Sequence, residues 1–258
     1  MTNSPLNRMY DDLADLWPLI SRPEEYAREA GYWRDVLRSE LGSGRHEILE
    51  LGVGGGHNLS HLTSDFLATA VDLSEKMLSQ CRMLNPDVRL HVGDMRTVRL
   101  GKRFKAVLVH DAISYMQTET DLRQVFTTAA EHLEPDGVFV VAPDHFRETF
   151  CSPRVEHATY SDGKTELTLI EYQYDPDPND TMTETLVFYL IRTQEGLRVE
   201  QDRHVLGLFP VQTWLDLMQE AGFSVEKLPY PVHRDERESY LLVGRWKGTH
   251  NRPDPGDS

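Results

Sequence analysis

Short apolar runs that end in glycine or polar residues recur through the first 142 residues of the chain. The first run, Ile48–Leu51, leads into glycines at positions 52, 54, 55 and 56 and then into a helical pattern. Further runs lie at Leu67–Val71, Val88–Met95, Phe104–Asp111 and Val138–Ala142. Continuous apolar strands with room for helices between them are typical of parallel sheets that are buried on both faces. The pattern predicts a doubly wound α/β domain with a Rossmann-like sheet.

The pattern changes after the fifth run, where strands follow one another without a helix. Thr165–Tyr174, Thr183–Arg192 and Leu197–Leu208 are predicted strands. Asp175–Asp180 is a turn cluster between the first two. Residues 150–208 are therefore expected to form an antiparallel β insertion after strand five. Its aromatic residues fit the roof of a pocket, a dimer interface or an ordinary sheet core.

The chain after the insertion is predicted to return to the central sheet. Pro210–Ala221 is a helical pattern, and strands are expected at Phe223–Leu228 and Ser239–Trp246. The ten residues 229–238 are too few for a crossover helix, which favours an antiparallel hairpin. The central sheet is then expected to have seven strands.

The segment before the first run is predicted to be helical. Pro23 and the two acidic residues after it suit a helix N-terminus, and apolar residues recur at helical spacing as far as Leu41. A helix is therefore expected at Pro23–Leu41. The expected organisation is a helical lid or cap at 1–44, a core at 45–149 and 209–248, the insertion at 150–208 and a disordered tail at 249–258.

The charge and composition of the chain limit its partners. A net charge of −15 leaves no cationic face for phosphates, so a nucleic-acid substrate is not expected. Two cysteines without a CxxC pair argue against a disulfide framework or a thiolate zinc site. The N-terminus has no apolar core of a signal peptide, and no apolar run reaches about 18 residues. A cytoplasmic protein without a membrane span is expected.

The glycine turn predicts a site for a small polar ligand. Glycines at the end of a strand let a ligand approach the backbone and leave amides free at a helix N-terminus. A dinucleotide fingerprint needs a third glycine where His57 stands. The spacing Glu50, Gly52, Gly54, Gly56 instead resembles motif I of the class I S-adenosylmethionine (SAM)-dependent methyltransferases.

Acidic residues at the ends of the next strands strengthen this resemblance. Asp72 lies 22 residues after Glu50, where an acid can accept hydrogen bonds from ribose hydroxyls. Gly93-Asp94-Met95 ends the third run, and Leu133–Gly137 resembles the family's turn into strand five. The resemblance covers roughly residues 45–145 and implies that SAM is the cofactor.

The resemblance also assigns roles to individual residues. It implies that SAM contacts Tyr10, Tyr26, Glu50, Gly52, Val53, Gly54, Gly56, Asn58, Asp72, Leu73, Met77, Gly93, Asp94, Met95 and His110. Leu73 and Met77 would flank the adenine. Asp94 would meet the adenine amino group, and His110 would offer its backbone carbonyl to the amino group of the cofactor.

A SAM fold with an insertion at this point is similar to the N-methyltransferases of nucleotide-linked amino sugars. Three short segments that resemble sequences of this subfamily support the similarity: Arg22–Ala30, Gly93–Arg96 and Asp144–Glu148. Met9–Trp17 resembles an N-terminal segment that folds over the cofactor as a lid. Tyr115 stands where that subfamily has a histidine near the transferred methyl group.

The expected function is methyl transfer from SAM to a nitrogen or oxygen of a small molecule, with a sugar or another natural-product intermediate among the candidates. Substrate contacts are expected from Tyr10, Asp111, Tyr115, Asp144 and His145, all near predicted strand ends or in the lid. Tyr115 and His145 are the candidate catalytic residues. No ligand spacing demands a metal, and none is predicted.

Two other classes remain open at this point. A non-catalytic SAM-fold binding or regulatory protein would keep the pocket without methyl transfer. An NAD-dependent oxidoreductase would need the glycine that is missing at His57. The insertion could, in addition, join two copies of the chain in a homodimer.

Overall fold

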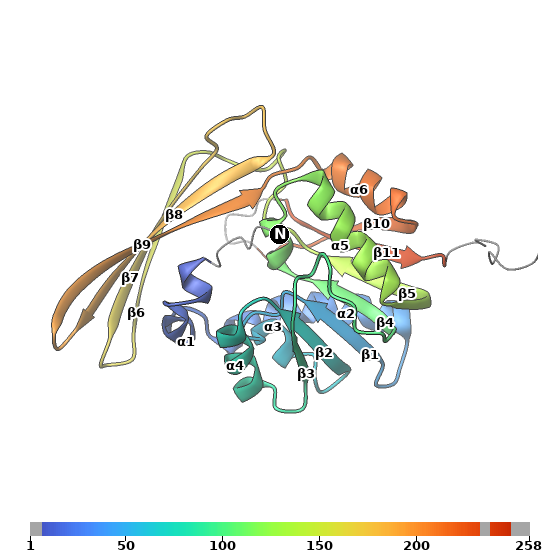
Figure 1. The fold of residues 1–258 in the computed structure, drawn as a ribbon, viewed down its shortest axis with the longest axis horizontal. Coiled ribbons are helices and arrows are strands. Elements are labelled where there is room, and N and C mark those ends of the chain that lie inside the picture. Colours follow the sequence, from blue (N-terminus) through green and yellow to red (C-terminus); the bar gives the residue numbers. More distant parts are fainter. Residues whose placement is uncertain (1–6, 233–237, 249–258) are drawn as a thin grey trace, which may run out of the picture.

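The computed structural model describes residues 7–232 and 238–248. A central sheet lies between two layers of helices, and a second sheet extends from one side of this domain (Figure 1). The central sheet contains seven strands, which lie side by side in the order β10 (Phe223–Pro229), β11 (Tyr240–Trp246), β5 (Leu133–Val141), β4 (Phe104–Val109), β1 (Glu47–Leu51), β2 (Leu67–Asp72) and β3 (Arg89–Val92). The predicted doubly wound, seven-stranded fold is confirmed.

The C-terminal strand of the sheet runs against its neighbours. β11 pairs antiparallel with β5 and with β10, whereas the strands from β1 to β5 pair in parallel. The predicted hairpin is confirmed, although residues 233–237 of its loop lie outside the described residues. The expected disordered tail, 249–258, also lies outside them. An antiparallel strand at this place is a feature of methyltransferases and not of the dehydrogenase version of the fold, which sets the oxidoreductase alternative aside.

Helices cover both faces of the central sheet because its strands are apolar on both faces. One layer contains α2 (Ala27–Leu41), α3 (His57–Ser60) and α4 (Glu75–Leu84), and the other contains α5 (Glu119–Glu131) and α6 (Val211–Glu220). Within the described ranges, no helix is long and apolar enough to span a membrane.

Neighbouring side chains of one strand reach two different cores, because successive residues point to opposite faces of a sheet. In β4, Leu108 joins the core that contains Trp33 of α2, and Val107 joins the core that contains Trp214 of α6. All four side chains are at most 1% exposed. Full burial of an apolar side chain of this kind contributes about 1.5–3 kcal/mol. The two cores thus hold the strand ends in fixed positions.

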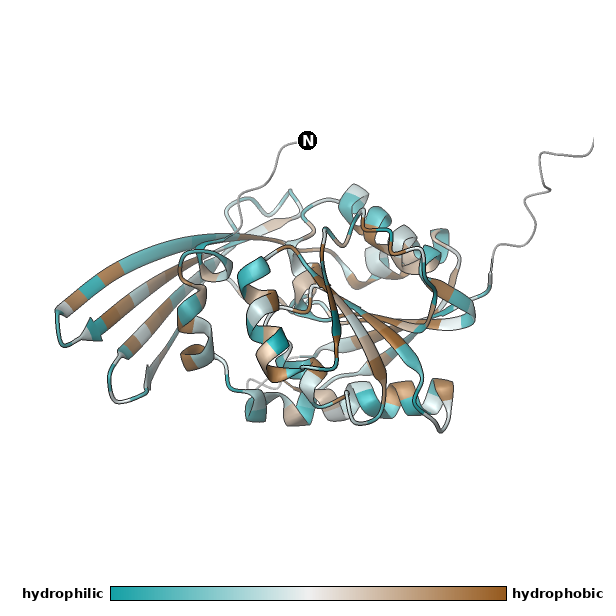
Figure 2. Ribbon diagram, turned by 60° about the horizontal axis from the view of Figure 1, so that its bottom comes forward, coloured by the Kyte–Doolittle hydropathy of each residue, from teal (hydrophilic) through white to brown (hydrophobic). Residues whose placement is uncertain are grey.

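The insertion after β5 is a four-stranded antiparallel sheet, as predicted. Its strands lie in chain order as β6 (Arg154–Ser161), β7 (Glu166–Tyr174), β8 (Met182–Thr193) and β9 (Gly196–Gly207). Hydrophobic and hydrophilic residues alternate along these strands (Figure 2). The sequence pattern did not single out β6, because most of its side chains are exposed and it lacks an apolar stripe.

The N-terminal segment covers part of the insertion. It consists of the short turns η1 (Arg8–Tyr10), η2 (Ala14–Leu16) and α1 (Trp17–Ile20). Met9 and Leu13 are buried in a small core against apolar side chains of β7 and β8. The first residues of the described chain are therefore fixed to strands that lie more than 150 residues later in the sequence.

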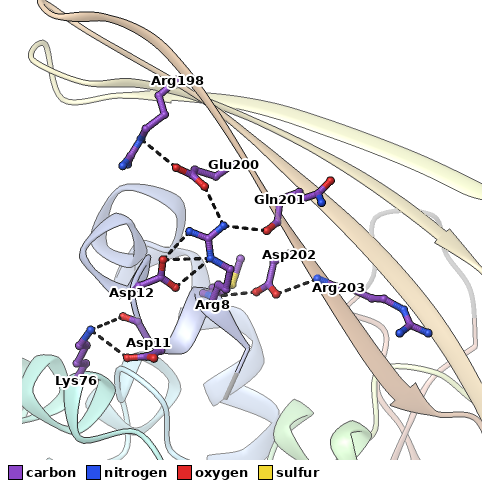
Figure 3. A network of polar contacts seen from close by, with 10 residues as sticks. Arg8, Asp11, Asp12, Lys76, Arg198, Glu200, Gln201, Asp202 and Arg203 are labelled. Atoms are coloured by element: carbon purple, nitrogen blue, oxygen red, sulfur yellow. Dashed lines mark hydrogen bonds and ion pairs between the residues drawn. The ribbon is translucent and has the colours of Figure 1, made fainter. Parts of the chain in front are cut away.

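Polar contacts add to this attachment (Figure 3). The Arg8 guanidinium lies 2.9 Å from the Glu200 carboxylate and donates to the Gln201 carbonyl at 3.1 Å. The Met9 amide donates to the Asp202 carboxylate at 3.0 Å. Because ion pairs at exposed positions contribute little, the buried apolar contacts carry most of the attachment.

The helix predicted from Pro23 is shorter than expected. Pro23–Tyr26 form a 3-10 turn, η3, and α2 begins only at Ala27. Turns of the 3-10 type are frequent at helix N-termini, where a proline without an N–H is also tolerated. The expectation of one continuous α-helix from Pro23 is therefore wrong, whereas its end at Leu41 is confirmed.

The predicted turn into strand five is a bend within the strand. Leu133–Gly137 already belong to β5, whose register against β4 shifts between Phe104 and Ala106. Asp136 adopts a left-handed backbone conformation with a φ of 59°. The extra residues bend the strand locally, as bulges do.

Candidate functional site

A cavity of about 560 Å³ lies at the carboxyl ends of the central strands. Open α/β sheets bind their ligands at this edge. Most residues assigned to the cofactor from the sequence line it: Tyr10, Tyr26, Glu50, Gly52, Val53, Gly54, Gly56, Asn58, Asp72, Leu73, Gly93, Asp94, Met95 and His110. Met77 does not line it; this side chain is fully buried in α4, beneath the glycine turn. We call this space the first cavity.

The glycine turn at the end of β1 depends on residues without a Cβ, because of its backbone conformation and, at Gly52 and Gly56, because of a lack of space. Gly52, Gly54 and Gly56 have φ values of 76°, 54° and 75°, which L-residues with a Cβ rarely adopt. A Cβ on Gly52 would stand 2.5 Å from the Cβ of Ala112, and one on Gly56 would stand 2.5 Å from the Sγ of Cys81. The turn therefore presents bare backbone to the first cavity.

Asp72, at the end of β2, is tied to the glycine turn. One carboxylate oxygen accepts the amide of Gly54 at 2.8 Å, and the other accepts the amide of Ser74 at 2.8 Å. Burial raises the pKa of Asp72, although these amides oppose the shift. Each carboxylate oxygen keeps a second lone pair. The residue is thus a rigid acceptor that suits the paired hydroxyls of a ribose.

Asp94, after β3, is held by an arginine. The Arg96 guanidinium lies 2.7 Å from Asp94 and 2.8 Å from Asp121, which belongs to the capping box of α5. Burial alone would raise the pKa of Asp94, but the hydrogen bonds from Arg96 lower it below its ordinary value. Asp94 therefore remains an ionised acceptor, which suits the amino group of an adenine.

Glu50 is a buried carboxyl group without a full set of partners. Its side chain is 2% exposed, lines the first cavity, and its Oε2 atom has no hydrogen-bond partner. Burial raises the pKa of Glu50 to about 8. A buried acceptor of this kind fits an ammonium group, such as the one on the methionine part of SAM. The residues of the first cavity are thus suited to the ribose, the adenine amino group and the ammonium group of that cofactor.

His110, after β4, belongs to a cluster of charges. Its two ring nitrogens lie 3.2 Å from the carboxylates of Asp111 and Glu29, and its Nε2 atom lies 3.3 Å from the Tyr230 hydroxyl. Burial would lower the pKa of His110, but Asp111 and Glu29 raise it well above its ordinary value. A histidine that is already protonated cannot accept another proton, so its side chain is unsuited to be a general base.

A second cavity, also of about 560 Å³, lies between the first cavity and the insertion. Seven residues line both cavities: Tyr10, Trp17, Tyr26, His110, Asp111, Asp144 and Leu206. The expected substrate contacts are divided between them. Tyr10, Asp111 and Asp144 line both cavities, Tyr115 lines the first, and His145 lines the second, where it lies 3.0 Å from the Gln173 amide.

The N-terminal segment forms a roof over the glycine turn. The Trp17 indole donates to Nδ1 of His57 at 3.2 Å, and the hydroxyl of Ser21 lies 3.1 Å from the same atom. A Cβ on Gly55 would stand 2.8 Å from the Trp17 nitrogen. His57, which breaks the dinucleotide fingerprint, is therefore the residue to which the roof is attached.

Sequence reasoning missed several residues of the site. Arg96 is adjacent to a recognised motif, and its position beside Asp94 was a usable signal. Leu206 and His204 come from β9 and carry no motif, so nothing local predicted that they reach the site. His204 lies 2.7 Å from the Tyr115 hydroxyl.

The described part of the chain contains no group of three or more His, Cys, Asp or Glu side chains arranged to hold a metal ion. The cluster of His110, Asp111 and Glu29 is satisfied by its own ion pairs.

Comparison with known families and proteins agrees with this geometry. Residues 48–137 match a family model described as a methyltransferase domain. The chain is 34% identical over 226 residues to a dTDP-3-amino-3,4,6-trideoxy-α-D-glucopyranose N,N-dimethyltransferase of Streptomyces venezuelae, which covers 85% of this chain and 94% of the relative.

Solved structures resemble the whole fold. DesVI of Streptomyces venezuelae has a TM-score of 0.78 at 31% identity, covering 90% of this chain and 96% of its own. The sugar N-methyltransferase KedS8 of a Streptoalloteichus species has a TM-score of 0.81 at 25% identity and covers 96% of both chains. The likeness therefore includes the insertion as well as the central domain.

Replacement of Asp72 by alanine tests the ribose assignment. We expect Asp72→Ala to weaken S-adenosylhomocysteine binding more than tenfold, because a charged acceptor is lost and each hydrogen bond to it contributes about 1.5–3 kcal/mol. Isothermal titration measures the affinity. Asp87→Ala, at an exposed position, is the matched control. Equal affinity in the two variants would contradict the assignment.

The raised pKa of Glu50 predicts a pH dependence of binding. Below pH 8 the free protein holds Glu50 protonated, whereas a ligand ammonium favours the carboxylate. Affinity for S-adenosylhomocysteine should therefore rise from pH 6 towards pH 8, by at most about tenfold per pH unit, and then level off. Titrations at several pH values measure this. Glu50→Gln cannot ionise and should remove the slope; an unchanged slope would show that another group causes it.

Proposed function

The chain belongs to the class I SAM-dependent methyltransferases, and we propose that within this family it methylates the amino group of a nucleotide-linked amino sugar. The relative from Streptomyces venezuelae, which is named for such a substrate, supports the proposal. One structural observation carries it: a cavity rich in carboxylates opens onto the first cavity at Tyr10, Asp111 and Asp144.

The charge of the second cavity favours an amine. Six carboxylate side chains line it, against two cations, Arg154 and the protonated His110; the carboxylates are Glu25, Glu29, Asp111, Asp144, Glu156 and Glu171. A negative wall attracts an ammonium group and repels the diphosphate of a nucleotide sugar. We therefore place the amine end of the substrate inside, at the junction of the two cavities, and the nucleotide end towards the opening.

The first cavity is the proposed cofactor site. The glycine turn, Glu50, Asp72 and Asp94 would hold SAM, and Met77 would support the turn from below rather than contact the adenine. When bound, SAM supplies a methyl group that is already activated by its sulfonium charge. The protein then has to align the amine, exclude water and accept one proton.

The N-terminal cap is the proposed means of excluding water. Its contacts from Trp17 and Ser21 to His57 place it over the glycine turn, and Tyr10 and Tyr26 line both cavities. We accordingly keep the organisation expected from the sequence: a cap at 1–44, a core at 45–149 and 209–248, and an insertion at 150–208.

The insertion is the proposed surface for a homodimer. Its outer strands, β6 and β9, expose apolar side chains, with Val155 61%, Leu197 63% and Val199 59% exposed. Edge strands with exposed apolar residues favour pairing between chains.

A direct assay tests the proposed reaction. With SAM and dTDP-3-amino-3,4,6-trideoxy-α-D-glucopyranose, we expect mono- and dimethylated products in mass spectra, because the amine is the intended nucleophile. The matched control is the same nucleotide sugar with a hydroxyl in place of the amino group, which should remain unmethylated. Methylation of the hydroxyl compound, or tight S-adenosylhomocysteine binding without turnover of either, would refute the amine assignment.

Light scattering after size exclusion tests the dimer. We expect a dimer for the wild-type protein and a monomer for the double variant Leu197→Asp and Val199→Asp, because charges at an apolar interface cost several kcal/mol when buried. Met83→Asp, at an exposed position on α4, is the control and should not change the mass. A wild-type monomer would rule out the interface.

A further inference from the structure

A chain of hydrogen bonds joins the junction of the two cavities to the insertion. The Tyr115 hydroxyl lies 3.0 Å from the Tyr10 hydroxyl and 2.7 Å from Nδ1 of His204. Nε2 of His204 lies 3.0 Å from the Asp202 carboxylate. Tyr10 lines both cavities, whereas the side chains of His204 and Asp202 are only 8% and 7% exposed. A continuous series of hydrogen bonds thus connects three separate segments of the protein: η1, the turn η4 (Asp111–Tyr115) and β9.

Asp202 fixes the orientation of the imidazole ring. Its carboxylate also accepts the backbone amides of Met9 at 3.0 Å and Arg203 at 2.9 Å (Figure 3). Burial would raise the pKa of Asp202, but the hydrogen bonds from His204 and Met9 lower it below its ordinary value. An ionised carboxylate accepts only, so Nε2 of His204 must carry a proton. The Nδ1 atom is then the nitrogen that gains or loses a proton, and it faces Tyr115.

The same heavy-atom positions allow two proton arrangements. When Nδ1 of His204 is protonated, it donates to Tyr115, and Tyr115 donates to Tyr10, as the geometry has it. When Nδ1 is unprotonated, the Tyr115 hydroxyl donates to His204 and the Tyr10 hydroxyl donates to Tyr115. The two arrangements differ by one proton at His204. In the first, the Tyr10 hydroxyl has its proton free to donate into the cavity. In the second, it has a lone pair free to accept a proton from the cavity. No side chain has to move between them.

Methyl transfer to an amine releases one proton for every methyl group. We propose that Tyr10, Tyr115 and His204, with the ring oriented by Asp202, form the relay that removes this proton; the inference rests on the proposed amine substrate. The amine nitrogen forms its bond to the methyl carbon while the carbon–sulfur bond breaks and its electron pair stays on sulfur. The methylated nitrogen then gives its proton to the Tyr10 oxygen, Tyr10 gives its own to Tyr115, and Tyr115 gives its own to Nδ1 of His204.

The two phenols and His110 are less suited than His204 to accept the proton. Burial raises the pKa values of Tyr10 and Tyr115 well above the ordinary value of a phenol, so each passes a proton on without remaining ionised. The ion pairs of His110 keep that ring protonated. An imidazole is the side chain that ordinarily exchanges a proton near neutral pH. The titratable groups that face His204 are Asp202, Tyr115, Tyr10 and Glu171.

His204→Asn separates proton transfer from structure. The asparagine side chain can keep a hydrogen bond to Tyr115 at the position of Nδ1, but it cannot take up a proton. We expect kcat with the amino sugar to fall on the order of 100-fold, while the KM values and the S-adenosylhomocysteine affinity stay unchanged. His157→Asn, on the exposed face of β6 in the same insertion, should retain the wild-type kcat.

A second variant tests whether the residues act as one unit. Tyr115→Phe interrupts the chain in the middle and should lower kcat to the same degree. The double variant of Tyr115→Phe and His204→Asn should lose no more than either single variant, because both break one relay. A wild-type kcat in His204→Asn, or a loss confined to KM, would overturn the relay, and so would additive losses in the double variant.

Nitrogen NMR of His204 with S-adenosylhomocysteine bound tests the relay without turnover. The neutral ring should carry its proton on Nε2, and Asp202→Asn should abolish this preference. A neutral ring protonated on Nδ1 would refute the relay, because Nδ1 could not accept. If the wild-type enzyme methylates no amino sugar, the proposed substrate fails, and the NMR result still decides whether the ring is oriented to accept a proton.

Discussion

The structure depends most on the absence of side chains at the glycine turn after β1. A single methyl group on Gly52 or Gly56 would overlap Ala112 or Cys81, so these two positions admit only glycine. The Gly54 amide then fixes the carboxylate of Asp72, and the Trp17 indole lies directly over Gly55. The cofactor site and its roof therefore depend on the same steric constraint, which is the need for glycine in the turn that follows β1.

The two halves of the site are built by different means. The first cavity rests on strand ends that two apolar cores hold in place, so its acids have fixed positions. The second cavity is enclosed by an added sheet and by an N-terminal segment, which meet in a small core around Met9 and Tyr189. In the proposed function, the cofactor binds in the central domain, whereas the insertion and the N-terminal segment select the substrate.

The charged neighbours of the two histidines at the junction of the cavities give His110 and His204 different roles. His110 is held as a cation by Asp111 and Glu29, and these two carboxylates outnumber the one cation where a positively charged methyl donor and an amine would meet in the proposed reaction. His204 is paired with a single carboxylate, Asp202, and reaches the junction through two phenols. One histidine thus keeps its proton, whereas the other is placed to exchange one.

The sequence by itself determined the parallel strands, the hairpin, the insertion and most of the first cavity. Those features follow from local patterns: apolar runs, glycine spacing and acids at strand ends. Only the tertiary structure decided that α2 starts after Pro23, that β6 exists as an exposed edge strand, and that His204 reaches Tyr115 across 89 residues. A local pattern records the conformation and burial of neighbouring residues. A contact between distant segments depends on how whole elements pack, and the residues in it carry no periodic signal.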